Sequence, residues 1–300
     1  MKRILFSILL ILIVIVSGCK KHEETVTSGR GIVLTADPYL PLIKQEVDQF
    51  MSLYPEVKIE ALGASTREVI VHLLNDSVHS IIIDRPFNEE EQQVAQQAAI
   101  KIVQNKIAED GVAIIVNKQN PISSITVELV RRIISSDATD WKEISKAQWS
   151  GSIDLVLTDK NSGMYELLQK KFFSLSKQLE PTVVMKNQRD VIQFISQHTQ
   201  AIGCVAASLV IGETEKIKAL SIKTKSPEGN EKEYLPYQQE IHNSLYPFHY
   251  SLYLYNVEAK STVGLGFSAL VLSNVGQKII QKAGLVPASI PYRTIQLTAE

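Results

Sequence analysis

The chain has few cysteines and no long run of charge of one sign. Its two cysteines among 300 residues are Cys19 and Cys204, so no internal disulfide framework forms if Cys19 has another role. Cys204 lies in the apolar stretch 201–206, which predicts a small buried residue rather than a nucleophile. The 31 basic and 32 acidic residues are interspersed, so the clustered cations that nucleic-acid binding requires are missing. We therefore predict no nucleic-acid partner.

Motifs of metal, nucleotide and hydrolytic chemistry are also missing. The six histidines show no metal-ligand spacing, and no His-Glu-x-x-His or Cys-x-x-Cys occurs. The G-x-S-x-G elbow and the G-x-x-x-x-G-K-[ST] loop are absent as well. The stretch 264–269 matches a loose G-x-G-x-x-A pattern, but no predicted strand leads into it, so we interpret it as helix packing. We expect no enzyme activity, no cofactor and no metal.

The N-terminus carries the pattern of an export signal. Lys2 and Arg3 precede the apolar run Ile4 to Val16, which is too short to span a bilayer but fits a secretory signal. The run ends in Val16-Ser17-Gly18-Cys19, which resembles the lipobox of bacterial lipoproteins, where the cysteine is acylated. An incidental cysteine at a signal-peptidase site is the alternative. We predict a lipoprotein with signal peptide 1–18, lipid such as palmitate on Cys19, a tether over 19–30, and a position at the membrane facing the periplasm or cell exterior.

From Gly31 onward, strands and helices alternate. Strands are predicted at 31–35, 57–61 and 80–83, with a helix after Asp37-Pro38, a helix over 67–74 and a third capped by Asn88 with Glu91 at the capping-box position. A further strand follows at 111–116. This alternation predicts a parallel, doubly wound sheet.

The same pattern starts afresh after Asn117. Thr126 caps a predicted helix over 127–134, and strands at 153–157, 182–185 and 202–205 alternate with helices at 164–173 and 190–197. A return strand at 216–223, a strand at 250–255 and one long helix at 263–283 are expected to pack on the first unit. We predict two doubly wound α/β lobes with a ligand cleft between them: lobe 1 from 31–116 and 220–300, and lobe 2 from 117–219.

Seven motifs stand out in order along the chain. They are Asp110–Asn117, Ile125–Leu129, Asp140–Ile144, Asn161–Met164, Ala201–Val205, Tyr246–Phe248 with Leu252–Tyr255, and Leu272–Ile280. In sequence and in order they resemble those of the phosphate-binding proteins of ABC transporters, which belong to the type II periplasmic solute-binding protein superfamily. The resemblance implies binding of a small oxyanion such as phosphate, with an ABC transporter permease as the partner. We also expect a monomer.

Three loops that follow predicted strands, at 35–38, 63–67 and 161–164, are placed to bind a ligand. Proteins of this kind hold an oxyanion with backbone N–H groups, helix dipoles, hydroxyls and usually an arginine. Asp84 matches a position where some phosphate binders carry an aspartate that accepts the ligand's proton. For Ser65 and Thr66 an ordinary N-cap role is the alternative, and for Asp84 a turn before a proline is. The predicted site comprises Ser65, Thr66, Arg67, Asp84, Ser162 and Gly163.

Three positions depart from the family pattern. Thr35-Ala36-Asp37 replaces Gly-Ser-Thr, Thr158 lies opposite the family's arginine, and Met164 replaces a threonine. Two hydroxyls and one cation are lost, and Asp37 adds a carboxylate that would repel a dianion. Two functions therefore stay open: capture of phosphate or a related oxyanion for an ABC transporter, and an envelope sensing or scaffolding role with altered or lost ligand binding.

Overall fold

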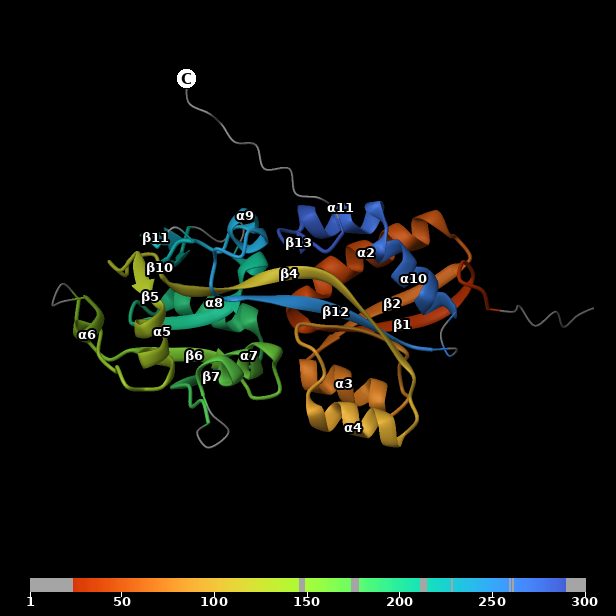
Figure 1. Ribbon diagram of the computed structural model, residues 1–300, viewed down its shortest axis with the longest axis horizontal. Helices are drawn as coiled ribbons and strands as arrows, with labels where there is room; N and C mark the ends of the chain where they lie inside the picture. Colours follow the sequence, from red (N-terminus) through yellow and green to blue (C-terminus); the bar gives the residue numbers. More distant parts are fainter. Residues whose placement is uncertain are drawn as a thin grey trace, which may run out of the picture.

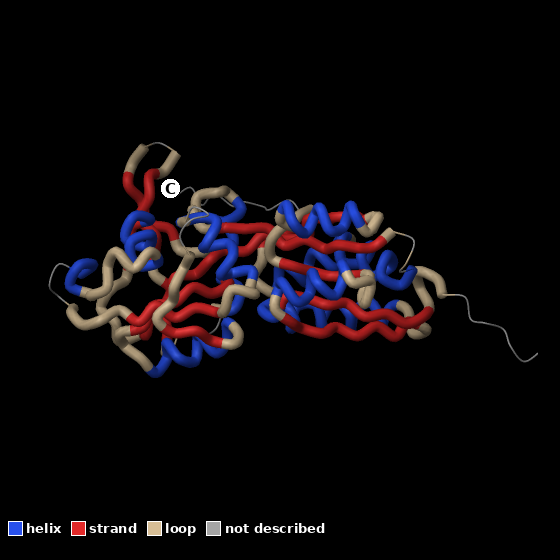
Figure 2. The backbone as a smooth tube through the Cα atoms, turned by 90° about the horizontal axis from the view of Figure 1, so that it is seen from below, coloured by secondary structure: helices blue, strands red, loops and turns tan. Residues whose placement is uncertain are grey.

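The computed structural model describes residues 24–145, 149–173, 178–210, 215–227, 229–258, 260 and 262–289. The predicted signal peptide, Cys19 and residues 290–300 lie outside the described residues. The molecule is elongated, and two α/β units lie side by side along its long axis (Figure 1). Figure 2 shows the strands of these units meeting in the middle of the molecule.

The first unit is built on three parallel strands. Strand β1 (Gly29–Ala36) lies between β2 (Val57–Ala64) and β3 (Ser80–Ile83). The 3-10 turn η1 (Asp37–Tyr39) and α2 (Leu40–Leu53) follow β1, while α3 (Thr66–Leu74) and α4 (Glu89–Gln97) follow β2 and β3. Helices α3 and α4 lie on the opposite side of the sheet from α2 (Figure 1). The doubly wound arrangement that the alternation predicts is thus present.

Local capping signals explain where these helices begin. The side chain of Asn88 accepts a hydrogen bond from the Glu91 backbone N–H at 2.9 Å, and Glu91 accepts one from the Asn88 N–H at 2.9 Å, which completes the predicted capping box. The strand start differs from the sequence prediction. Gly29 and Arg30, placed in the tether, already pair with Val57 and Lys58, because β2 offers them backbone partners.

Two long antiparallel strands connect the units. Strand β4 (Ile102–Asn117) pairs with β12 (His249–Val257) over its first half and with β8 (Ala201–Ala206) and β9 (Ile217–Ala219) over its second half. Strand β12 also pairs with β3. The sheet therefore runs without a break in the order β2-β1-β3-β12-β4-β8-β6-β7. Only the second half of β4 was predicted from the sequence.

The second unit repeats the alternation. Strand β6 (Asp154–Thr158) pairs in parallel with β7 (Val183–Met185) and with β8. Its helices are α5 (Val127–Ile134), α6 (Lys142–Ser145), α7 (Gly163–Phe172) and α8 (Gln188–Gln197), with β5 (Ser124–Thr126) before α5 and the turn η2 (Ala207–Leu209) after β8. Thr126 caps α5 as predicted, because its hydroxyl accepts a hydrogen bond from the Leu129 N–H at 3.2 Å.

The chain was predicted to return to the first unit at residue 220, but the strands that directly follow residue 220 pair within the second unit. The expected strand 216–223 is two strands, β9 and β10 (Ser221–Lys225). Strand β10 pairs in parallel with β5 and antiparallel with β11 (Glu231–Tyr234), and its buried Ile222 lies opposite Ile125 of β5 in the second unit. After α9 (Gln238–His242), β12 is the first strand to pair with the first unit.

The predicted long final helix is also divided. It forms α10 (Thr262–Leu272) and α11 (Asn274–Lys282), followed by β13 (Val286–Pro287), which pairs with β4. Ser273 separates them because its hydroxyl accepts a hydrogen bond from the Val275 N–H at 3.2 Å and so starts a new helix. Among the described residues, no single helix is long and apolar enough to cross a membrane; α10 and α11 meet those criteria only as a pair bent by 66°.

Two smaller sequence interpretations concern buried residues. Cys204 is 2% exposed, and burial raises the pKa of its thiol to about 12, as expected for a packing residue. Gly266 in the G-x-G-x-x-A stretch lies so close to the Val26 carbonyl that an added Cβ would approach it to 1.9 Å. This close approach supports the interpretation of that stretch as helix packing.

Candidate functional site

A small pocket lies where the loops after five strands converge. These loops follow β1, β2, β3, β6 and β7, at the carboxyl edge where ligands bind in open α/β sheets. The pocket encloses about 20 Å³, enough for about one water molecule. Its lining residues are Asp37, Pro38, Ala64, Ser65, Thr66, Asp84, Thr158, Asp159, Ser162, Gly163, Lys186, Asn187 and Gln188.

Three helices begin at this pocket. The side chains of their N-cap residues Ser65, Ser162 and Asn187 accept hydrogen bonds from backbone N–H groups of α3, α7 and α8 at 3.4, 3.1 and 3.0 Å. Ser65 is therefore the N-cap of α3, which was the alternative role for this residue, and it also lines the pocket. The positive ends of three helix dipoles meet at the same space, which favours an anion.

Thr66, Asp84 and Gly163 form a hydrogen-bonded contact between the units. The Thr66 hydroxyl donates to Asp84 Oδ1 at 2.7 Å and accepts from the Gly163 N–H at 3.0 Å. Thr66 is 2% exposed and Asp84 is 1% exposed. An added Cβ on Gly163 would lie 1.8 Å from Asp84 Oδ1, so this arrangement requires glycine. The hydroxyl of Ser162 lies 2.5 Å from that of Thr158 beside this contact.

Carboxylates outnumber cations in the lining. Asp37, Asp84 and Asp159 are present, and Lys186 is the one lysine or arginine among the lining residues. Burial raises the pKa of Asp84, and the hydrogen bond from Thr66 opposes this only partly. Burial and the neighbouring Glu68 raise the pKa of Asp37, while Lys186 opposes them. The arrangement can hold an oxyanion through backbone N–H groups and hydroxyls, with the Asp84 side chain as an acceptor for a proton of the ligand.

Arg67 is the one predicted site residue that the pocket does not include. Its side chain is exposed, and its backbone N–H donates to the Asn161 carbonyl at 3.0 Å across the two units. The side chain turns outward because Thr66, its neighbour on α3, turns inward, and successive helix positions point in different directions. Arg67 therefore contributes a backbone hydrogen bond, and, contrary to expectation, its guanidinium does not line the pocket.

The loop Lys186–Gln188 was missed by sequence reasoning. It follows β7, which is parallel to β6, so it reaches the same edge as the loop after β6. The predicted strand 182–185 followed by a helix was the signal that could have identified it. Gln188 is 3% exposed, and its side-chain carbonyl accepts a hydrogen bond from the Ala206 N–H at 2.6 Å, which fixes the start of α8.

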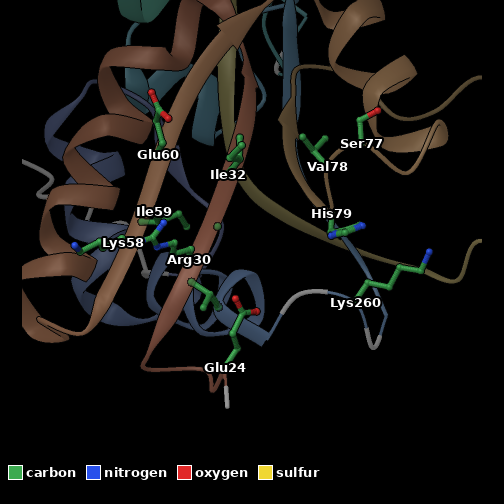
Figure 3. A pocket seen from close by; sticks show the side chains of 12 residues that line it. Glu24, Arg30, Ile32, Lys58, Ile59, Glu60, Ser77, Val78, His79 and Lys260 are labelled. Atoms are coloured by element: carbon green, nitrogen blue, oxygen red, sulfur yellow. The ribbon is translucent and has the colours of Figure 1, made fainter. Parts of the chain in front are cut away.

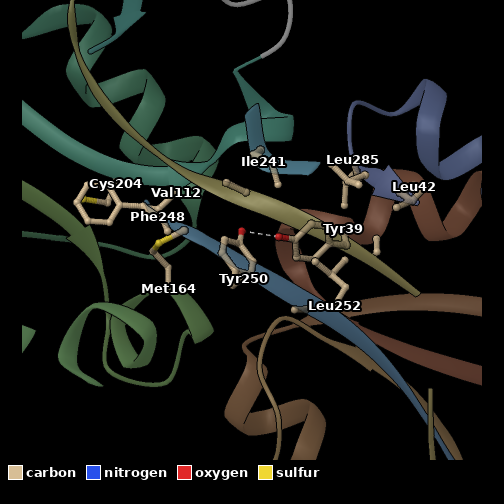
Figure 4. Close-up of a cluster of buried hydrophobic side chains, with 14 of the residues drawn as sticks. Tyr39, Leu42, Val112, Met164, Cys204, Ile241, Phe248, Tyr250, Leu252 and Leu285 are labelled. Atoms are coloured by element: carbon tan, nitrogen blue, oxygen red, sulfur yellow. Dashed lines mark hydrogen bonds between the residues drawn. The ribbon is translucent and has the colours of Figure 1, made fainter. Parts of the chain in front are cut away.

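A buried polar network lies beneath the loop after β1. Tyr39 in η1 and Tyr250 in β12 share a hydrogen bond of 2.6 Å (Figure 4), and the Tyr39 hydroxyl donates to Asp110 at 3.3 Å. The Ser208 hydroxyl also donates to Asp110 at 2.6 Å. Burial raises the pKa of Asp110 to about 6. This network fixes the Asp37-Pro38 loop to both connecting strands and to the second unit.

A larger groove lies elsewhere on the first unit. It encloses about 750 Å³ at the amino ends of β1 and β2, between those strands and the residues before β3 (Figure 3). No predicted site residue lines it. Its lining residues are Glu24, Arg30, Gly31, Ile32, Lys58, Ile59, Glu60, Ser77, Val78, His79, Lys260 and Val263. Within the described chain, no three or more His, Cys, Asp or Glu side chains are arranged so that they could hold a metal ion.

A two-lobed α/β fold with a pocket at converging strand ends is that of a solute-binding protein. The chain belongs to the PBP superfamily: a family model described as PBP superfamily domain matches residues 22–275. This confirms the family resemblance and the fold class predicted from the motifs.

The curated relatives are phosphate-binding proteins. The phosphate-binding protein PstS of Staphylococcus saprophyticus is 26% identical over 255 residues, which span 82% of this chain and 76% of that protein. PstS of Staphylococcus aureus strain USA300 is 23% identical over 252 residues, spanning 83% and 75%.

Solved structures with the same fold include proteins of phosphate transport. One is described as a phosphate ABC transporter substrate-binding protein from Clostridium perfringens with bound phosphate, with a TM-score of 0.75 and 20% identity over 87% of this chain and all of that one. Another is an ABC-type phosphate transport receptor from Vibrio cholerae, with a TM-score of 0.66 and 19% identity over 86% of this chain and 100% of that one. At these identities the likeness establishes the fold.

Proposed function

We propose that this protein captures phosphate, or a closely related small oxyanion, outside the cytoplasm and delivers it to the permease of an ABC transporter. The observation that carries the proposal is the convergence of three helix N-termini and the Thr66–Asp84 pair on one pocket between the units. The relatives named for phosphate binding support the same ligand. We assign no catalysed reaction to the chain.

The pocket suits a protonated oxyanion better than a fully ionised one. Backbone N–H groups at the starts of α3, α7 and α8 and the hydroxyls of Ser65 and Ser162 supply neutral donors, while the Thr66 hydroxyl donates to Asp84. Asp84 then discriminates by proton chemistry. As a carboxylate it accepts a hydrogen bond from a protonated phosphate, whereas sulfate carries no proton at neutral pH and meets a like charge.

Isothermal titration of the chain from Lys20 onward with phosphate, sulfate and molybdate tests the ligand. We expect one phosphate per chain and weaker binding of sulfate. Ser162→Ala removes a hydroxyl from the pocket, and because a hydrogen bond to a charged group contributes about 1.5–3 kcal/mol, affinity should fall by about tenfold to a hundredfold. Ser52→Ala, at an exposed serine of α2, is the matched control.

The second candidate function is sensing or scaffolding in the envelope. It is favoured by a specific feature of the pocket, where three carboxylates face one lysine and Thr158 stands in place of the family's arginine. Heat from none of the three anions, together with an unchanged melting temperature in their presence, would support this candidate over transport.

We also propose that Cys19 carries the lipid anchor after removal of residues 1–18, that the chain is monomeric, and that the two units are the lobes of the binding cleft. The lipobox-like sequence before Cys19 supports the anchor, and the strand pairings support the lobes. Cys19→Ser should release the protein from the membrane fraction. Retention of that variant at the membrane with normal processing would contradict the anchor.

A further inference from the structure

Arg85 connects the two units beside the pocket without lining it. It follows Asp84 after β3 and is 5% exposed. Its Nη1 and Nη2 donate to the two carboxylate oxygens of Glu91 at 2.7 and 2.8 Å, and its Nε lies 2.5 Å from Glu166 Oε2. Glu91 belongs to α4 of the first unit, whereas Glu166 belongs to α7 of the second unit. One guanidinium therefore bridges the units.

The two halves of this bridge differ in how firmly they are built. Glu91 is fixed by the capping box of α4, and Arg85 Nη1 also donates to the Pro86 carbonyl at 3.0 Å. These contacts within the first unit are enough to fix the position of the guanidinium. Glu166 lies in the first turn of α7, three residues after Gly163, and its side chain is 35% exposed. If the second unit moves away, Glu166 leaves a preorganised arginine and gains water.

We propose that the Arg85–Glu166 ion pair is a latch that stabilises the closed arrangement of the cleft. The pocket holds about one water molecule, so a ligand of phosphate size enters when the units separate. Separation breaks this ion pair together with the Gly163–Thr66 and Arg67–Asn161 hydrogen bonds. The fixed, bidentate arginine loses little side-chain entropy when the pair forms again, which makes it suitable for repeated closure.

Only the purpose of the latch rests on the proposed function. Closure of the two units itself can be measured without a ligand. Single-molecule energy transfer between dyes on Glu89→Cys in α4 and Lys170→Cys in α7 reports the separation of the units. Both positions are exposed, Cys204 is buried and so shielded from the dyes, and the chain from Lys20 onward lacks Cys19. Glu166→Gln removes the charge on the second unit, and Glu166→Lys reverses it.

We expect the ratio of closed to open molecules to fall about tenfold in Glu166→Gln, equivalent to about 1.4 kcal/mol, and further in Glu166→Lys. Glu143→Gln is the matched control, because Glu143 has a similarly exposed side chain and pairs with Arg132 at 3.0 Å within the second unit. It should leave the ratio unchanged.

Phosphate titration of the same proteins separates the latch from the proposed function. A change in the ratio without phosphate binding would support the latch and contradict phosphate capture. Distance distributions in both Glu166 variants that match the parent and Glu143→Gln would overturn the latch, whatever the titration gives. Circular dichroism of each variant verifies that the fold is intact.

Discussion

The groove on the first unit and the pocket between the units are two hollows that differ in size and in chemistry. The groove at the amino ends of β1 and β2 encloses about 750 Å³, and the pocket between the units about 20 Å³. Most side chains that line the groove are exposed, such as Ile32, which is 45% exposed, whereas Thr66 and Asp84 in the pocket are buried and hydrogen-bonded. If volume alone were the criterion, the groove would be the candidate anion site. Helix N-termini and buried polar groups point to the pocket instead. In an α/β fold, helix N-termini at the carboxyl ends of strands supply the N–H groups and the positive dipole ends that bind anions.

A pair of glycine substitutions gives the largest expected difference between the two hollows. In Gly163→Ala the new Cβ would lie 1.8 Å from Asp84 Oδ1, so the closed contact between the units cannot form. We expect phosphate affinity to fall by about a hundredfold, the equivalent of about 2.7 kcal/mol, which is in the range of overpacking costs. In Gly31→Ala, in the groove, the nearest side-chain atom would be at an ordinary 3.6 Å, and affinity should change less than twofold.

Titration calorimetry measures both affinities, and thermal unfolding verifies that both variants fold. Gly163 begins a helix, where alanine is favoured, so loss of binding in that variant would come from the clash and not from the backbone. Equal binding by Gly163→Ala and the parent would show that the closed contact has no part in holding the ligand.

Removal of one hydroxyl in each hollow gives the next smaller effect. Thr66→Val removes the donor to Asp84 and the acceptor of the Gly163 N–H, which leaves two buried polar groups without their partner. At about 1–3 kcal/mol for a buried unsatisfied group, phosphate affinity should fall about tenfold to a hundredfold. Ser77→Ala removes an exposed hydroxyl from the groove and should have no effect. An equal loss in both variants would remove the distinction between the hollows.

The pH dependence of sulfate binding should show which hollow binds the anion, because the carboxylates of the two hollows differ in pKa. Burial raises the pKa of Asp84 above its usual 3.8, whereas a hydrogen bond from Lys260 holds the pKa of Asp76, beside the groove, below 3.8. Protonated Asp84 can donate to sulfate. As pH rises through its folded pKa, the carboxylate repels sulfate, and affinity should fall by up to about tenfold per pH unit. Phosphate, which keeps a proton, should lose less.

The sign of the stability effect follows from the same shift. A carboxyl whose folded pKa lies above its unfolded value binds more protons in the folded state, so Asp84 lowers stability as pH rises from 3.8 through the folded pKa. Asp84→Asn should remove most of the pH dependence of sulfate affinity, and Asp76→Asn should leave it intact. A pH profile unchanged in Asp84→Asn would exclude Asp84 as the titrating group.

Much of the fold was predictable because its signals are local. The bounds of β3 and α5 match the prediction, since Thr126 caps α5 and an apolar run marks β3. The first half of β4 was missed because its partner β12 lies far away in the sequence and its polar residues face water. The break at Ser273 was missed because apolar residues continue on both sides of that cap.

Much of the lining of the candidate site was predictable, but the contacts between the units were not. Ser65, Thr66, Asp84, Ser162 and Gly163 follow strands, and all five line the pocket. The Lys186–Gln188 loop required knowledge that β7 pairs in parallel with β6. The Thr66–Gly163 hydrogen bond joins residues of different units, and no pattern within either segment encodes it.

The smallest expected effect tests the groove directly. Arg30 and Lys58 are exposed and lie opposite each other in the β1–β2 pair, and like charges in that position are unfavourable. Lys58→Gln should therefore stabilise the protein by a few tenths of a kcal/mol in a buffer without phosphate, as thermal unfolding would record. If the pocket is the anion site, phosphate raises the melting temperature of Lys58→Gln as much as that of the parent. If that rise disappears in Lys58→Gln and persists in Thr66→Val, the anion binds between the two cations of the groove, and the comparison of the two hollows is reversed.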